Sequence, residues 1–408
     1  MHWANNNVEK LARLLLLTGL FGLGGCTYLD SLMGEEEEII DPPALLVDFP
    51  ASLDVKQIWD RNTGKGTDEQ YLMLAPVIDG ERIYVASTDL KVVALNATNG
   101  KSLWTHTLSI AKSGGFWSGG DEVHLTGGPG FGSSMVFTGS SKGDVVASNS
   151  ETGEEVWVST LSSEVLSAPQ IATDGTVVVR TLDGKIYGLS GNNGRRLWSF
   201  DQTVPALTLR GTSAPAIDGP MVVAGFDGGR VVALEISSGR VMWETSIAIP
   251  SGRSELDKMV DIDATPIIRD GVVYVSTYQG QMAALTANSG RMLWNRDMSS
   301  FAGFTIDDTN IYITDSKSVV WALDRLNGTP MWKQEGLLNR QVTAPAVLGN
   351  YIVAGDFEGY LHWMDKTTGG FVARQKISGD RIIAPPLSAN NIIYTFSTDG
   401  NLAAQTIQ

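Results

Sequence analysis

The chain has 408 residues, 43% of them apolar and 18% charged, and its formal net charge is −15. Nucleic-acid binding relies on lysine and arginine displacing counterions from phosphates, so this composition excludes nucleic acid as an expected partner. A single cysteine excludes an intramolecular disulfide, and with only four histidines it argues against a metal site of thiolate or imidazole ligands. We therefore expect no bound metal.

The first 25 residues have the pattern of a signal peptide that is removed. Lys10 and Arg13 precede an apolar run, Leu14–Leu23, that is about half as long as a membrane-spanning helix needs to be. The run ends at Leu-Gly-Gly-Cys26, which resembles a bacterial lipobox, in which the cysteine becomes the lipidated first residue. The alternative is an ordinary signal followed by a buried cysteine.

The resemblance to a lipobox implies a location. Thr27 stands where an inner-membrane lipoprotein typically carries aspartate, so sorting to the outer membrane is implied, with the protein facing the periplasm. Acyl chains on Cys26 would hold the protein to the membrane. Residues 26–50 contain four consecutive glutamates and two adjacent prolines, a composition typical of a solvated linker. We expect them to form a flexible tether.

A repeated Gly-x-x-x-Trp pattern organises the rest of the chain. Successive copies are separated by 38 to 53 residues, a period typical of propellers and solenoids. A seventh copy, from Gly369 to Ala373, has lost the aromatic residue. The six complete copies are Gly100/Trp104, Gly153/Trp157, Gly194/Trp198, Gly239/Trp243, Gly290/Trp294 and Gly328/Trp332.

Each repeat predicts four short strands joined by hairpins. A repeat begins with a dipeptide such as Ala214-Pro215, which is followed by a β-branched run and a Gly/Asp turn. A second apolar run and a tight turn then lead to the tryptophan. Glycine at the last turn position supplies the positive φ that such hairpins require. A large aromatic at one fixed position per repeat is expected to pack between adjacent sheets. These blade-packing residues are Trp59, Trp104, Trp157, Trp198, Trp243, Trp294 and Trp332.

The repeat count predicts a closed ring. Eight repeats begin near Ala75, Leu125, Ala168, Ala214, Thr265, Phe304, Ala344 and Pro385. The last one stops after Leu402–Ala404, before its tryptophan strand, whereas a spare tryptophan strand, Val55–Trp59, precedes the first. Pairing the two satisfies both edges. We predict an all-β protein in which residues 51–408 form one eight-bladed β-propeller of four-stranded antiparallel blades, closed by the N-terminal strand. A linear solenoid leaves both ends unexplained.

No catalytic residue is expected. Gly139–Gly143 matches G-x-S-x-G but falls in a hairpin, whereas that motif works on a strand-to-helix turn. The glycine-rich segment 127–132 lacks the lysine and helix of a phosphate loop and is expected to be a connection between blades. His106, His124 and His362 occur singly, without the spacing of metal ligands.

The segment Ala94–Trp104 resembles the tryptophan-docking repeat of pyrroloquinoline-quinone-dependent dehydrogenases, which are also eight-bladed propellers. That resemblance supplies the alternative function: a quinoprotein-type dehydrogenase, or a propeller that binds a small molecule. The dehydrogenases stack their quinone against a disulfide of adjacent cysteines. This chain has one cysteine, so that arrangement is impossible and no cofactor is expected.

The lipobox, the eight repeats and two segments between repeats resemble a second family more closely. The segments are Pro205–Pro215 and Glu255–Pro266, and the family is BamB, the lipoprotein subunit of the outer-membrane β-barrel assembly machinery. The resemblance implies a non-catalytic scaffold that docks the POTRA domains of the barrel-forming subunit and assists insertion of outer-membrane proteins. Unfolded outer-membrane proteins, bound along a blade edge, are a further candidate partner. The partner-binding residues it implies are Leu207, Leu209, Arg210, Asp261 and Asp263.

The lengths of these two segments support an exposed site independently. From tryptophan to proline they span 17 and 23 residues, against 12 from Trp157 to Pro169 and 13 from Trp332 to Pro345. Connections of this type all emerge on one face of a propeller, and successive ones are neighbours. Two leucines and an arginine beside two aspartates are typical of an interface hot spot. The alternative is that the leucines pack into the blade and the arginine pairs internally with an aspartate.

Overall fold

The computed structural model describes residues 41–68, 70–110, 122–202, 213–248 and 260–408. Backbone contacts separate the chain into two units, residues 1–42 and 43–408, and all of the strands belong to the second. Cys26 lies before residue 41 and so outside the described residues. The propeller unit begins at Pro43, earlier than the boundary at residue 51 that the sequence predicts.

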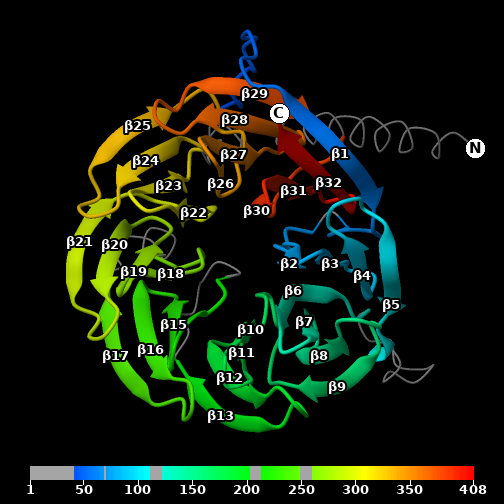
Figure 1. Cartoon of the computed structure of the whole chain (residues 1–408). Helices are drawn as coiled ribbons and strands as arrows, with labels where there is room; N and C mark the ends of the chain where they lie inside the picture. The colour runs from blue at the N-terminus through cyan, green and yellow to red at the C-terminus, as the bar shows by residue number, and fades with distance from the viewer. Residues whose placement is uncertain (1–40, 69, 111–121, 203–212, 249–259) are drawn as a thin grey trace, which may run out of the picture. The chain divides into compact units, whose positions relative to one another are not determined.

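Eight four-stranded antiparallel sheets follow one another around a ring, each with its first strand near the centre and its fourth at the rim (Figure 1). Blades 1 to 4 contain β2 (Val77–Asp79), β3 (Arg82–Ala86), β4 (Lys91–Asn96) and β5 (Ser102–Thr107); β6 (Leu125–Gly132), β7 (Met135–Ser140), β8 (Asp144–Asn149) and β9 (Glu155–Thr160); β10 (Gln170–Ile171), β11 (Thr176–Arg180), β12 (Lys185–Ser190) and β13 (Arg196–Asp201); and β14 (Ala216–Asp218), β15 (Met221–Phe226), β16 (Arg230–Glu235) and β17 (Val241–Ser246).

Blades 5 to 8 continue in the same order. They contain β18 (Ile267–Arg269), β19 (Val272–Ser276), β20 (Gln281–Thr286) and β21 (Met292–Asp297); β22 (Gly303–Ile306), β23 (Asn310–Thr314), β24 (Val320–Asp324) and β25 (Pro330–Gln334); β26 (Ala346–Leu348), β27 (Tyr351–Gly355), β28 (Tyr360–Asp365) and β29 (Phe371–Lys376); and β30 (Leu387–Ala389), β31 (Ile392–Phe396), β32 (Asn401–Ile407) and β1 (Val55–Asn62).

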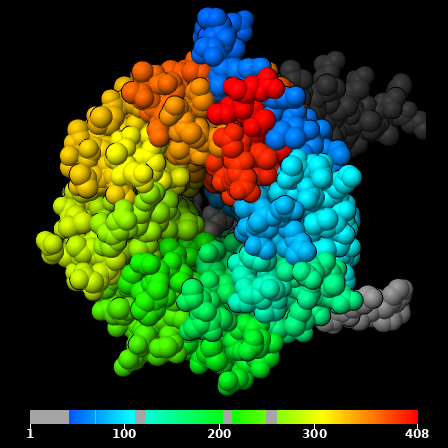
Figure 2. Space-filling model, in the orientation of Figure 1, coloured from blue at the N-terminus to red at the C-terminus, as the bar shows by residue number. Residues whose placement is uncertain are grey.

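Blade 8 closes the ring with strands from both ends of the unit. β1 pairs antiparallel with β32, so that Val55 lies opposite Ile407 and Asn62 lies opposite Asn401. In the space-filling view the C-terminal atoms of this blade pack directly against the atoms of the N-terminal strand (Figure 2). The predicted eight-bladed propeller, closed by the N-terminal strand, is confirmed.

The apolar core lies between blades. Every residue of β11 is buried, because the inner strands of one blade are covered on both faces by neighbouring blades. One cluster joins Val223 and Trp243 of blade 4 to Val275 and Leu285 of blade 5, and similar clusters recur around the ring. The apolar runs without alternation in the sequence therefore correspond to strands with no solvent-facing side.

The seven predicted tryptophans bridge adjacent blades. Each lies in the fourth strand of its blade, and its indole N–H donates a hydrogen bond to a main-chain carbonyl of the next blade. The donor–acceptor distances are between 2.6 and 3.3 Å. The pairs are Trp59–Ala97, Trp104–Ser150, Trp157–Gly191, Trp198–Ile236, Trp243–Ala287, Trp294–Arg325 and Trp332–Lys366.

The glycine of each repeat has two roles, of which the sequence indicates only one. Gly239 has φ +68, as its turn requires, but it also lies beneath the indole ring of Trp198 in the preceding blade. A Cβ atom at Gly239 would stand 2.6 Å from the ring carbon Cε3 of Trp198. The glycines of the other repeats meet the tryptophan of the preceding blade in the same way.

Ala373 replaces tryptophan where the docking turn is missing. A tryptophan in β29 would lie over the turn between the third and fourth strands of blade 8. Those strands are β32 and β1, which are the two ends of the unit and are not joined by a turn. The aromatic residue therefore has no glycine to cover, and a buried alanine takes its place.

The glycine-rich segment 127–132 is not the predicted connection. It lies within β6, the innermost strand of blade 2, where the register with β7 shifts twice. A Cβ atom at Gly130 would stand 2.0 Å from the carbonyl oxygen of Pro169. Glycine lets this strand approach the backbone of blade 3, a tertiary contact that the local pattern does not reveal.

We expect Gly239→Ala to lower the free energy of unfolding by about 3 kcal/mol, because the new methyl group is strained at positive φ and also meets the Trp198 ring. Urea unfolding measures this loss. Gly219→Ala is the matched control, because Gly219 has φ +53 but a Cβ atom there would meet nothing within 4 Å, and it should cost about 1 kcal/mol. Equal losses in both variants would show that the indole contact contributes nothing.

Candidate functional site

One face of the propeller carries both long connections that the sequence singles out. In every blade the strand order places the second-to-third turn and the connection to the next blade on the same side, called here the connector face. The connections from β13 to β14 and from β17 to β18 meet there. Ser213 Oγ donates to the Ala264 carbonyl at 3.3 Å, and the Ala214 N–H donates to Thr265 Oγ1 at 3.2 Å.

Three of the five predicted partner-binding residues, Leu207, Leu209 and Arg210, lie outside the described residues. Asp261 and Asp263 lie in the connection before β18, and they are only 1% and 9% exposed. The sequence predicts both aspartates on an exposed loop. The structure instead turns their side chains inward, towards the turns of blades 3 and 4.

A buried arginine faces these aspartates. Arg180 ends β11, and its Nη2 lies 3.7 Å from Oδ1 of Asp227, which follows β15. Its Nη1 donates to the Ser213 carbonyl at 3.4 Å, and its guanidinium lies over the Phe226 ring, 5.4 Å from the centroid. Arg180 therefore ties blade 3 to blade 4 and to the first long connection. Arg180, Asp227, Asp261 and Asp263 are called the acidic cluster below.

The two connector aspartates differ in their surroundings. Asp261 accepts a hydrogen bond from the Gly228 N–H at 3.3 Å, and its main-chain carbonyl accepts one from the Tyr278 N–H at 2.8 Å. Asp263 has both carboxylate oxygens buried without a hydrogen-bond partner. A buried acceptor without a partner costs free energy in the isolated protein, so Asp263 is the least satisfied group of the cluster.

Burial raises the pKa of two carboxyl groups of the acidic cluster, those of Asp263 and Asp227. Desolvation raises the pKa of Asp263 to about 7; the negative charges of Asp261 and Asp227 add to this rise, and Arg180 opposes it. Desolvation also raises the pKa of Asp227 to about 6, against the attraction of Arg180. Burial lowers the pKa of Arg180, although the three carboxylates oppose this change. The cluster holds more carboxyl groups than its single arginine neutralises.

Sequence reasoning missed Arg180 and Asp227. A charged residue directly after Val177–Val179 is a detectable signal, because a strand buried on both faces seldom ends in an unpaired arginine. Its partner could not be found the same way. Arg180 and Asp227 stand at the same turn of consecutive blades, and only the packing of one blade on the next brings them together.

The described residues give no sign of a metal centre: they contain no group of three or more histidine, cysteine, aspartate or glutamate side chains placed to hold an ion. Within the same ranges, no helix combines the length and apolar character needed to cross a bilayer. Among the described residues, the second of the two adjoining connections brings the carboxyl groups of Asp261 and Asp263 towards the guanidinium of Arg180.

Comparison with known proteins identifies the family. The profile described as "Outer membrane protein assembly factor BamB" matches residues 52–121 and 111–334. The Pseudomonas aeruginosa protein of that name is 40% identical over 367 residues, which cover 90% of this chain and 93% of the relative. The chain belongs to the BamB family.

Two solved structures are also similar to this BamB-family chain. The crystal structure of BamB from Moraxella catarrhalis matches with a TM-score of 0.75 and 26% identity, covering 86% of this chain and all of that one. The quinohemoprotein alcohol dehydrogenase of Comamonas testosteroni matches with a TM-score of 0.68 but only 14% identity, covering 88% of this chain and 78% of that one. The second likeness shows a shared fold alone.

We expect the variant Asp263→Asn to be more stable than the unmodified protein at pH 8, and this advantage to shrink at pH 5. Asp263 has a pKa of about 7 in the folded protein, whereas an aspartate in the unfolded chain has a pKa of about 4. The unfolded chain therefore releases the proton at lower pH, and the free energy of unfolding falls as the pH rises from about 4 to about 7. Asparagine removes that loss, which is on the order of a few kcal/mol. Thermal unfolding at both pH values measures it.

Asp218→Asn is the control, because Asp218 is an exposed aspartate of the same blade as Asp227. It should change neither melting temperature. If Asp263→Asn shifts the melting temperature equally at pH 5 and pH 8, the carboxyl group does not titrate in this range and the electrostatic description of the cluster is wrong.

Proposed function

We propose that this protein is a non-catalytic lipoprotein scaffold of the outer-membrane β-barrel assembly machinery, and that its connector face docks the POTRA domains of the barrel-forming subunit. The observation that carries the proposal is the pair of long, hydrogen-bonded connections in a chain of the BamB family. The name of that family describes an assembly factor and not an enzyme.

The acidic cluster gives the docking surface a rigid base. Arg180 joins blades 3 and 4 to the first connection, and Asp261 joins the second connection to the turns of blades 4 and 5. A surface held in one arrangement before binding loses less conformational entropy when a partner arrives. Leu207 and Leu209 supply apolar anchors in this proposal, and Arg210 supplies the charge that fixes orientation.

The proposal includes a lipid anchor at Cys26 that places the propeller in the periplasm, attached to the outer membrane. The sequence around Cys26 supports it. An anchored scaffold stays close to a membrane-embedded partner, so even a modest affinity suffices for docking.

The dehydrogenase alternative has weaker support. Its solved representatives share the fold at 14% identity or less, and the single cysteine of this chain cannot form the disulfide on which those enzymes stack their quinone. Adding pyrroloquinoline quinone should therefore give neither dye reduction nor a rise in melting temperature. A clear signal in both assays would favour the enzyme.

We expect the double variant Leu207→Ala/Arg210→Glu to lose co-purification of the barrel-forming subunit from detergent-solubilised membranes, because it removes an apolar anchor and reverses the orienting charge. The control is Leu326→Ala/Arg240→Glu. Leu326 is 80% exposed, Arg240 is also exposed, and both lie in turns between third and fourth strands, on the opposite face. Unchanged co-purification with a folded Leu207→Ala/Arg210→Glu protein would refute docking through the connector face.

The outer strands of the blades favour a second class of binding partner. In seven described fourth strands an exposed apolar residue directly precedes the tryptophan, and the outer edges of these strands are open to an added strand. These residues are Ile58, Leu103, Val156, Leu197, Met242, Leu293 and Met331. We propose that extended segments of unfolded outer-membrane proteins bind along such edges.

A photo-crosslinking residue at Leu197 should therefore capture unfolded outer-membrane proteins during their assembly. The same residue at Val372 is the control, because it occupies the equivalent position in β29 but its carbonyl already accepts hydrogen bonds from Ser52 and Leu53. Equal capture at both positions would indicate non-specific contact and would count against binding at the edge.

A further inference from the structure

Residues 44–53, called the strap below, are fixed to the propeller although they form no strand. The Ala44 N–H donates to the Leu338 carbonyl at 2.9 Å. At the other end, the N–H groups of Ser52 and Leu53 both donate to the Val372 carbonyl, at 2.9 and 3.2 Å. The strap therefore lies beside the outer strand of blade 7, next to β29 at the rim (Figure 1).

Two arginines hold the strap by its backbone. Arg340 Nη1 donates to the Ala44 carbonyl at 3.1 Å, and Arg374 Nη1 donates to the Val47 carbonyl at 3.1 Å. Phe49 adds a ring contact, since it stacks on Phe371 with centroids 5.5 Å apart, and the Arg374 guanidinium lies 5.0 Å from its centroid. The side chain of Val47, in contrast, is exposed.

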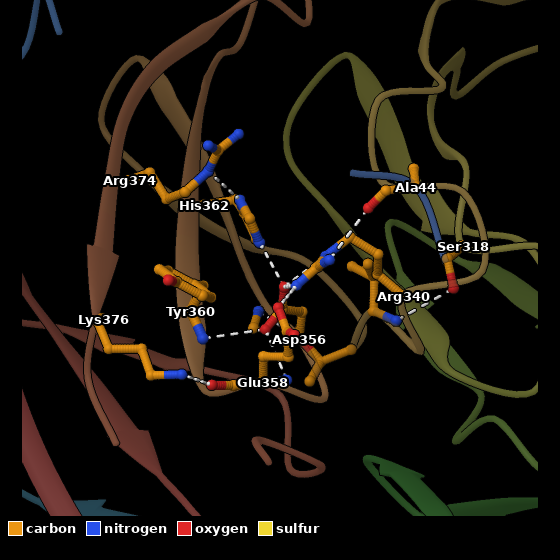
Figure 3. A network of polar contacts seen from close by, with 12 residues as sticks. Ala44, Ser318, Arg340, Asp356, Glu358, Tyr360, His362, Arg374 and Lys376 are labelled. Atoms are coloured by element: carbon orange, nitrogen blue, oxygen red, sulfur yellow. Dashed lines mark hydrogen bonds and ion pairs between the residues drawn. The ribbon is translucent and has the colours of Figure 1, made fainter. Parts of the chain in front are cut away.

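Both arginines are positioned by a buried pair, Asp356 and His362 (Figure 3). Asp356 Oδ2 accepts from Arg340 Nε at 2.8 Å and lies 2.9 Å from His362 Nε2. His362 Nδ1 lies 3.2 Å from Arg374 Nε. Because arginine can only donate, Nδ1 accepts, so Nε2 carries the proton and donates to Asp356. Burial lowers the pKa of His362, which agrees with this neutral form.

The network therefore presents two fixed guanidinium groups to main-chain carbonyls. Arg340 is 3% exposed and also pairs with Glu358, so its geometry is set before the strap arrives. Contacts to carbonyls do not depend on side-chain identity, which suits a segment that otherwise has the composition of a linker. The two guanidinium groups come from different elements, because Arg340 precedes β26 and Arg374 lies in β29.

We propose that this network is a clamp that sets the length of the membrane tether and the place where it leaves the propeller. Leu338 and Arg340 belong to the connection from β25 to β26, which lies on the connector face. The chain towards Cys26 thus leaves from the rim of the face that carries the acidic cluster. The inference rests on the lipid anchor of the proposed function.

The clamp changes the reach of the tether appreciably. Eighteen residues separate Cys26 from Ala44, and 29 separate Cys26 from Val55, the first residue of β1. A fully extended chain covers at most about 3.3–3.6 Å per residue, so the reach is about 60 Å with the strap in place and about 100 Å without it. The strap restricts how far the connector face can move from the membrane.

The test uses the full-length protein purified from membranes and the double variant Phe49→Ala/Arg374→Ala. Hydrogen exchange should become about tenfold faster at the amides of Ala44, Ser52 and Leu53, while the β1 amides that pair with β32 stay protected. Arg296→Ala is the matched control, because Arg296 is a half-buried arginine in β21, the outer strand of blade 5. It should leave exchange in the strap unchanged.

The second measurement is energy transfer from a dye at Leu182→Cys, an exposed position in the second-to-third turn of blade 3 on the connector face, to acceptor lipids in phosphatidylethanolamine–phosphatidylglycerol vesicles. Transfer should fall when the clamp variant releases the strap. Unchanged exchange would refute the clamp, and faster exchange with unchanged transfer would refute its control of the tether. If the unmodified protein does not associate with the vesicles, the lipid anchor is wrong and the tether role falls with it, whereas the exchange data still decide whether the clamp exists.

Discussion

A sheet of four short strands cannot cover its own apolar faces, so every blade of this propeller depends on its neighbours. The contact that fixes their spacing is an indole ring lying on a glycine of the next blade, with the indole N–H bonded to a carbonyl there. This contact satisfies a polar group and buries a large aromatic surface at once. The contact recurs at seven of the eight junctions between blades, so most of the arrangement of the unit follows from one local geometry.

The connector face uses the rigidity that these contacts provide. Arg180 and Asp227 belong to consecutive blades, and they meet at a useful distance only because the blades are held at a fixed spacing. The same applies to the second network, in which Arg340 and Arg374 are aligned by Asp356 and His362. In both places a buried charge is maintained by the fold and directed towards a segment that has little structure of its own.

The ring could be predicted from the sequence because the signal of each blade is local: a glycine, a turn and a tryptophan lie close together. Counting these repeats, and adding the spare strand at Trp59 to the incomplete last one, predicts eight blades. The cluster could not, because Arg180 and its aspartates come from separate blades and connections. The inward orientation of Asp261 and Asp263 was likewise hidden, since burial depends on neighbours. The binding of the strap was hidden too, because Arg340 and Arg374 contact its main-chain carbonyls and leave no signal in its side chains.

The pairing of β1 with β32 has a consequence for how the molecule is made. Ribosomes synthesise β1 before the other strands of the propeller, yet among the described strands it pairs only with β32, the last strand of the eight blades. Seven blades can therefore assemble in order while the newborn protein still has an open seam with two bare edges. Contacts between such distant segments form slowly, and a propeller that lost β32 would keep that seam and be exposed to proteases and to aggregation.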